Sequence, residues 1–148
     1  MINLRQATSK DIPWMLDEGK KFLSLMSETK NYYNRDHLSG VLNFILKEGI
    51  MYVTEDEGKL VGAIGGMIVP NVFNGDIKDL GELFWWVPED YRNTRSGYLL
   101  MREFTKYGEN AGVDNVVFSS MEFSPINEDA MTKRGFKKKE TAYVMEVN

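Results

Sequence analysis

Residues 82–112 constrain the fold more than any other segment, because a strand, a polar loop and a helix follow one another there. Residues 83–87 read LFWWV, an aromatic and β-prone run that Pro88 ends, since proline cannot donate to a continuing ladder. Residues 92–97 read RNTRSG, and Gly112 is a typical helix stop. Four apolar positions between them share one helix face, at Leu100, Phe104, Tyr107 and Ala111. Free N–H groups at the start of such a helix predict an anion site, most often for phosphate.

Missing residue types exclude several kinds of chemistry. The 148-residue sequence has no cysteine, which excludes disulfides, a thiolate nucleophile and a Cys-based zinc site. The single histidine, His37, cannot form a His-cluster metal site, and no nucleophile-elbow pattern is present. We interpret His37 as a surface residue early in a helix. Any chemistry must therefore rest on carboxylates, hydroxyls, backbone amides and a bound cofactor, without a metal.

Length and charge indicate one ordinary globular domain, spanning residues 1–148. The sequence is 43% hydrophobic and 27% charged, as is usual for globular proteins. A net charge of −4 gives no electrostatic reason to expect a nucleic-acid partner. The sequence has no apolar run of about 18 residues, so we expect no membrane span. The first residues lack the layout of a signal peptide, so we expect a cytoplasmic protein.

Seven β-prone runs alternate with helical patterns and predict an α/β protein with a mixed sheet. The expected strands cover residues 2–6, 50–54, 59–69, 83–87, 115–119, 136–139 and 141–147. The expected helices cover about residues 12–27, 35–47, 98–111 and 125–134. A strand–helix–strand unit in the middle favours a parallel, right-handed crossover. Three glycines in one strand indicate a close neighbour, a bulge or a bend, or simply tolerance of small residues, at Gly62, Gly65 and Gly66.

This order of elements, with its central segment, resembles the GNAT acyltransferase superfamily over nearly the whole chain. Residues 2–12 look like the common start of the family, and residues 84–92 look like its fourth strand and the entry to its phosphate loop. A late Asn-x-x-Ala and Gly-Phe signature is matched by Asn127, Ala130, Gly135 and Phe136. The resemblance implies a mixed, mostly antiparallel sheet of about seven strands with a central, parallel splayed pair, flanked by about four helices. The chain looks most similar to short members of the family from tailed phages and some bacteria, which share its Arg-x-x-Arg-x-Gly loop.

The resemblance implies acetyl-CoA as cosubstrate. The splayed strands of the family would leave the backbone of Trp85 and Val87 free to pair with the pantetheine arm. Backbone amides of the loop would hold the diphosphate, at Arg92, Asn93, Thr94, Arg95, Ser96, Gly97 and Tyr98. Arg95 replaces a glycine of the family pattern, and it either adds charge to the diphosphate site or marks a loop that no longer closes. Asn127 would contact pantetheine, or cap a helix.

The absence of cysteine favours direct attack by an amine on the thioester. Glu82 is the best candidate for the general base, against a solvated carboxylate or a structural salt bridge. The family's usual tyrosine acid is replaced by Met131, which removes a group that typically contributes ~10²–10⁴ in rate. Solvent, Ser120 or Tyr143 would then protonate the thiolate.

The sequence leaves the acceptor and the partners open. A small-molecule amine or a peptide or protein amine is expected, and a homodimer is an open alternative. By the resemblance, the acceptor pocket would be built from Trp14, Tyr32, Tyr33 and Phe73. The alternative function is a catalytically weak or inactive acyl-CoA-binding or protein-interaction module on a GNAT scaffold. A phage-encoded version would act in the host cytoplasm.

Overall fold

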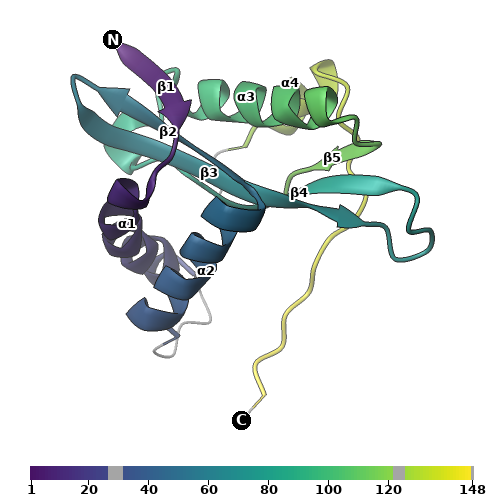
Figure 1. Cartoon of the computed structure of the whole chain (residues 1–148), viewed down its shortest axis with the longest axis horizontal. Coiled ribbons are helices and arrows are strands. Elements are labelled where there is room, and N and C mark those ends of the chain that lie inside the picture. The colour runs from purple at the N-terminus through teal and green to yellow at the C-terminus, as the bar shows by residue number, and fades with distance from the viewer. Residues whose placement is uncertain (27–31, 122–125, 148) are drawn as a thin grey trace.

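The computed structural model describes residues 1–26, 32–121 and 126–147. These residues form one sheet of five strands in the order β1-β2-β3-β4-β5, with neighbours antiparallel except for the parallel pair β4 and β5. Figure 1 shows α1 and α2 on one face of the sheet and α3 on the other. The strands are β1 (Ile2–Gln6), β2 (Ile50–Asp56), β3 (Lys59–Pro70), β4 (Lys78–Trp86) and β5 (Asn115–Val117). The helices are α1 (Ile12–Ser24), α2 (Arg35–Glu48), α3 (Ser96–Ala111) and α4 (Glu128–Lys133), with 3-10 turns η1 (Ser9–Asp11) and η2 (Glu89–Tyr91).

Each face of the sheet has its own apolar core. On the α1 and α2 side, Met15, Leu42 and Ile45 pack against β2 and β3. On the α3 side the core consists of Ile50, Ile64, Leu80, Leu100 and Phe104. The helical spacing therefore predicted three inward positions of α3 correctly, at Leu100, Phe104 and Tyr107, but Ala111 in its last turn is exposed.

The capping sequence before α1 folds as predicted. The Asp11 carboxylate accepts a hydrogen bond from the Thr8 amide at 2.8 Å. It also accepts two from the Arg5 guanidinium, each at 2.8 Å. The Arg5 guanidinium holds the pKa of the buried Asp11 carboxyl below its usual range. This pair ties β1 to the start of α1.

Two of the open interpretations of the β3 glycines are correct. A Cβ at Gly62 would collide with the hydroxyls of Ser96 and Thr54, so the glycine allows α3 to approach the sheet. Gly65 pairs with Phe84, but Gly66 pairs with Glu82. Leu83 is therefore an extra residue in β4, which is a β-bulge.

The prediction of about seven strands is wrong for the described residues. The expected strands at 136–139 and 141–147 do not form, and this segment runs as an extended chain away from the sheet (Figure 1). Its apolar side chains are exposed, with Tyr143 93% and Met145 82% accessible. A β-prone run forms a strand only where a neighbour supplies backbone partners, and the adjacent edge strand β5 has three residues.

Several element ends also differ from the predictions. β4 begins at Lys78 because it pairs with the end of β3, although residues 78–82 lack a β-prone pattern. β5 ends at Val117, two residues early. The first turn predicted at Pro125 lies outside the described residues, and α4 begins at Glu128.

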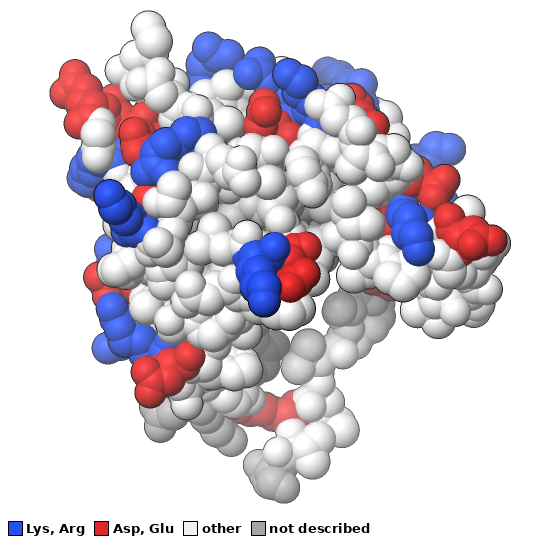
Figure 2. Space-filling view, viewed as in Figure 1, with Lys and Arg blue, Asp and Glu red and all other residues white. Residues whose placement is uncertain are grey.

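The charged surface is mixed. On the face viewed in Figure 2, basic and acidic side chains are interspersed, and basic ones gather along the edge that α3 occupies. Among the described helices, none combines the length and apolar character that a bilayer crossing needs.

Candidate active site

β4 and β5 pair only along the first part of β4 and then separate. Their parallel pairing covers Asp79–Asn115, Leu80–Val116 and Gly81–Val117, where β5 ends. Residues 82–86 of β4 then pair only with β3. Among the described residues, no strand therefore neighbours the backbone on the other edge of this part of β4. This is the splayed pair that the resemblance implied, although it lies at one edge of the sheet and not at its centre.

A cavity of about 550 Å³ lies at this opening, between β4, the start of α3 and α4. Eight of the eleven predicted site residues line it, namely Glu82, Trp85, Val87, Arg92, Thr94, Gly97, Tyr98 and Asn127. The side chains of Asn93, Arg95 and Ser96 do not. Most of the site predicted along residues 82–98 is thus brought to one cavity.

The first turn of α3 presents unpaired amides to this cavity. The Ser96 amide donates to the Thr94 hydroxyl at 3.2 Å, and the Leu99 amide donates to the Arg95 carbonyl. Among the described residues, nothing accepts a hydrogen bond from the amides of Gly97 and Tyr98, and both residues line the cavity. Such amides at a helix N-terminus bind anions.

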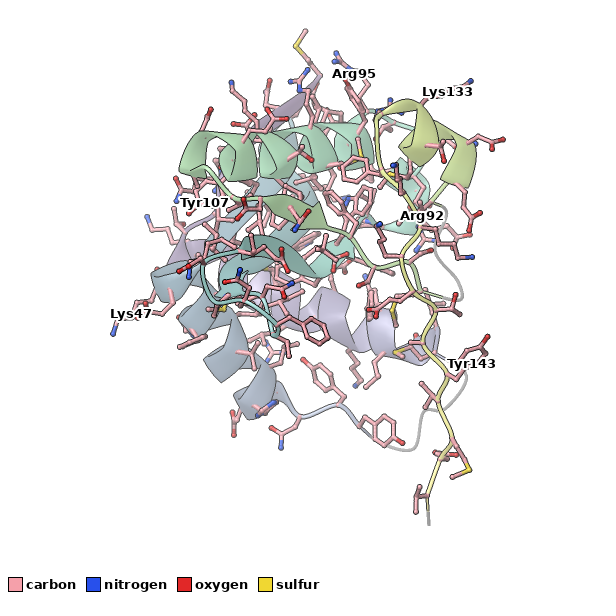
Figure 3. All side chains as sticks on the ribbon, turned by 90° about the vertical axis from the view of Figure 1, so that its right-hand side faces the viewer. Lys47, Arg92, Arg95, Tyr107, Lys133 and Tyr143 are labelled. Atoms are coloured by element: carbon pink, nitrogen blue, oxygen red, sulfur yellow. The ribbon has the colours of Figure 1, made fainter. Side chains whose placement is uncertain are left out.

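The two loop arginines have different surroundings. Arg92 donates from Nε to the Val87 carbonyl at 3.0 Å, and its guanidinium lies 5.1 Å from the Trp86 ring centre. The Val87 carbonyl, predicted to pair with pantetheine, therefore already has a partner. Arg95 is exposed, and Figure 3 shows it at the upper edge of the molecule, apart from Arg92. The side chain of Arg95 does not line the cavity that its position in the loop suggested.

Glu82 is a half-buried carboxylate at the floor of the cavity. It lines the cavity and immediately precedes the bulge residue Leu83. Burial raises the pKa of Glu82 to about 7, although a hydrogen bond from the Ser119 amide acts in the opposite direction. A carboxyl group with such a pKa exists in both protonation states near neutral pH, as a general base requires.

The expected proton donors lie in different places. Met131 lines the cavity and offers no proton. Ser120 and Tyr143 do not line it, and Figure 3 shows Tyr143 on the extended C-terminal segment, so Tyr143 is not a candidate donor here. Ser119, which lines the cavity, was missed because a polar residue after a short strand carries no distinguishing pattern.

Asn127 has the capping role that was left open. Its side-chain oxygen accepts from the Ala130 amide at 3.1 Å, at the start of α4. Nearby, the Arg134 guanidinium lies 5.0 Å from the Tyr98 ring centre. Arg134 and Tyr98 both line the cavity, so this stack joins α4 to α3 across it.

A second cavity of about 340 Å³ lies between α1, α2 and the sheet. Three of the four predicted acceptor residues line it: Trp14, Tyr32 and Tyr33. Phe73 does not, because it is 96% exposed at the tip of the β3–β4 loop. The prediction for Phe73 is therefore wrong.

Comparison with known families agrees with this geometry. The family model described as the acetyltransferase (GNAT) family matches residues 14–136. The chain belongs to this GNAT family. Solved structures resemble the GNAT chain over almost its whole length, whereas no curated protein matches it significantly.

Three solved structures illustrate the shared GNAT fold. A predicted acetyltransferase from Clostridium acetobutylicum, solved with acetyl-CoA, has a TM-score of 0.77 at 15% identity and covers 100% of this chain and 96% of its own. A ribosomal-protein-alanine N-acetyltransferase from Brucella melitensis has a TM-score of 0.73 at 11% identity, covering 99% of each chain. Glucosamine-6-phosphate N-acetyltransferase from Arabidopsis thaliana has a TM-score of 0.69 at 15% identity, covering 100% and 99%. At such low identities, the likeness concerns the fold alone.

The described residues of this GNAT protein contain no cluster of metal-ligand side chains. In the described ranges, no three or more His, Asp or Glu side chains gather in a way that could hold a metal ion. The described cavity instead offers unpaired amides for an anion, an open strand edge, and the Glu82 carboxyl group with a pKa of about 7.

Proposed function

We propose that this GNAT protein is an N-acetyltransferase that moves an acetyl group from acetyl-CoA to an amine by direct attack in a ternary complex. The observation that carries the proposal is the shared cavity, which joins the unpaired α3 amides of Gly97 and Tyr98 to Glu82. One end suits a diphosphate and the other suits a reaction that needs a base.

In the proposed complex, the diphosphate binds at the first turn of α3. Anions are stabilised there by unpaired N–H groups and by the helix dipole. The pantetheine arm lies along the open edge of β4, beside Trp85, with the Val87 N–H as its remaining backbone partner. Asn127 and Arg134 border the same cavity from α4. We assign Arg92 to holding the strand end, through its bond to the Val87 carbonyl.

The acetyl transfer uses Glu82 as the general base. Glu82 takes a proton from the ammonium form of the acceptor, directly or through one water. The amine nitrogen then bonds to the thioester carbonyl carbon, and the carbon–sulfur bond breaks with its electron pair left on sulfur. The nitrogen releases its extra proton to water, which leaves the neutral amide. Holding both substrates in one cavity supplies the proximity that this attack needs.

The thiolate leaves without a tyrosine acid. Met131 replaces that group, and a thiolate is a weak base with a pKa of about 8.5 for its acid form, so water can protonate it. Ser119 adds a hydroxyl to the cavity lining, and its amide contacts Glu82. We therefore expect slower turnover than a tyrosine would allow, rather than none.

Titration calorimetry with acetyl-CoA, followed by an assay of free CoA release with a panel of amines, tests this proposal. We expect binding in the micromolar range and release of CoA that depends on the amine. Absence of binding at high micromolar acetyl-CoA would contradict the proposal. Tight binding without release would instead favour the non-catalytic module. The resemblance to short phage and bacterial GNAT proteins stays a hypothesis that rests on the loop motif.

A further inference from the structure

We infer that the acceptor is a small primary amine carried on an apolar body, aromatic or branched aliphatic, which lies in the second cavity. This inference rests on the proposed acetyl transfer and names the class of substrate for it. It follows from how the two cavities meet, from what lines the second one, and from how its one carboxylate is compensated.

The two cavities share one wall. Four residues line both of them, namely Phe22, Leu83, Phe84 and Trp86. Three of these belong to the bulged part of β4, directly after Glu82. An amine that enters from the α1 and α2 side therefore meets the first cavity beside the proposed base. A group attached to that amine would remain in the second cavity.

The lining of the second cavity is mainly apolar. Side chains from α1, α2, β3 and β4 supply it, including Trp14, Leu38, Val41, Leu42, Ile45 and Ala63. Two of its few polar side chains have partners within the protein, because the Tyr33 hydroxyl donates to the Leu16 carbonyl at 2.5 Å and the Asn34 side chain accepts from the His37 amide at 3.0 Å. The His37 imidazole is a further polar group of the lining. A ligand with many hydroxyl or ammonium groups would lose more hydration there than so few polar groups can replace.

The one carboxylate of this lining is already neutralised. Glu18 has a side chain that is only 7% exposed, and it accepts from the Trp86 indole at 3.1 Å. Its other oxygen lies 2.7 Å from the Lys21 ammonium. Both carboxylate oxygens therefore have partners, and among the described lining residues no unpaired carboxylate recruits a second ammonium. This arrangement disfavours diamines and polyamines.

The size of the cavity favours a small molecule over a peptide. Its volume of about 340 Å³ lies at the lower end of ligand pockets, which range over ~300–1,000 Å³. An aromatic ring on a short alkyl chain matches that scale. Each buried methylene strengthens binding by about fourfold, so selection among amines should follow apolar size.

The wild-type protein provides the first test, with acetyl-CoA at saturation. We expect kcat/KM to rise by about threefold to fourfold per methylene from propylamine to hexylamine, and phenethylamine to exceed ethanolamine by more than ~30-fold. Diaminobutane should react at least ~10-fold less efficiently than butylamine. A peptide with an N-terminal phenylalanine tests the macromolecular alternative in the same assay.

A cavity-filling variant provides the second test. Val41 lines only the second cavity, from the exposed side of α2. Val41→Phe should raise the KM for phenethylamine by ~10-fold and leave the calorimetric Kd for acetyl-CoA within about twofold. Asn43→Phe is the matched control, because Asn43 is exposed on the same helix and does not line the cavity.

The outcomes separate the inference from the function on which it rests. If acetyl-CoA does not bind, or binds without turnover of any amine, both the inference and the proposed acetyl transfer are overturned. Turnover in which ethanolamine, diaminobutane or the peptide equals or exceeds phenethylamine overturns the inference and leaves acetyl transfer standing. An unchanged KM in Val41→Phe, with the fold intact by circular dichroism, also overturns it.

Discussion

The hydroxyl oxygens of Thr54 and Ser96 lie 2.6 Å apart in the interior, and they join β2 to the first residue of α3. The Ser96 hydroxyl also contacts the Val61 carbonyl at 3.1 Å, on β3. Both side chains are fully buried, and Gly62 leaves the space that they occupy. The position of the α3 amides relative to the sheet is therefore set by this contact.

Substituting Gly62 should disturb that contact. A Cβ in Gly62→Ala collides with both hydroxyls, so we expect a loss of ~1–3 kcal/mol in the free energy of unfolding and weaker acetyl-CoA binding. Gly40→Ala is the control, because a Cβ there meets open space within α2 and should add ~0.5–1 kcal/mol. Urea unfolding and calorimetry measure both. Equal stability of the two variants would refute the close-approach argument.

Activity should depend on the protonation of Glu82. Because the pKa of Glu82 is raised to about 7, we expect kcat/KM to rise with pH through that value. Glu82→Gln should lower kcat by ~10²–10⁴ and remove this rise, with acetyl-CoA affinity nearly unchanged. Glu89→Gln is the matched control, since Glu89 is exposed and outside the cavity lining. Full activity in Glu82→Gln would remove Glu82 as the base.

The same residue should affect stability in the opposite direction. Its pKa rises from 4.5 to about 7 on folding, so the protonated form is the one that the fold favours. That contribution is complete below about pH 4.5 and is lost as pH rises through about 7. Glu82→Gln cannot ionise, so its free energy of unfolding relative to wild type should increase by about 1–3 kcal/mol between pH 5 and pH 8. A pH-independent difference in chemical denaturation would contradict the raised pKa.

The two loop arginines should differ in importance. Arg92→Ala removes the bond to the Val87 carbonyl and the stack on Trp86, so we expect acetyl-CoA binding to weaken by ~10-fold or more. Arg95→Gly should leave binding within about threefold, because the Arg95 side chain is exposed outside the cavity lining. Calorimetry at one ionic strength compares them. Weakening by more than ~10-fold in Arg95→Gly would assign Arg95 to the diphosphate.

Local patterns predicted much of the fold. The helix face of Leu100 and Phe104, and the left-handed Gly112 after α3, follow from periodicity and from the conformational freedom of glycine. The C-terminal strands were predicted by the same kind of pattern, and they failed because a strand needs a partner. Tyr143 lies in a β-prone run, but no ladder pairs with its segment among the described residues.

The candidate site was predicted in outline, and its details were not. The loop and its helix start were recognisable because residues 92–97 follow a strand pattern and precede an amphipathic helix pattern. The sequence did not show where the Arg95 side chain points or that Arg92 bonds to the Val87 carbonyl. A side chain's contacts depend on residues that the loop meets only after folding. The apolar second cavity likewise combines α1, α2 and β4, which lie far apart in the sequence.

By itself, the sequence determined the segment at 82–112: a strand ended by proline, a polar loop that starts a helix, and a carboxylate before them. These features depend on neighbours within a few residues. Only the tertiary structure decided that the Ser119 amide contacts Glu82, that the bulge at Leu83 joins two cavities, and that burial raises the pKa of the carboxyl. Desolvation depends on which distant atoms exclude water, and one-dimensional spacing does not contain that information.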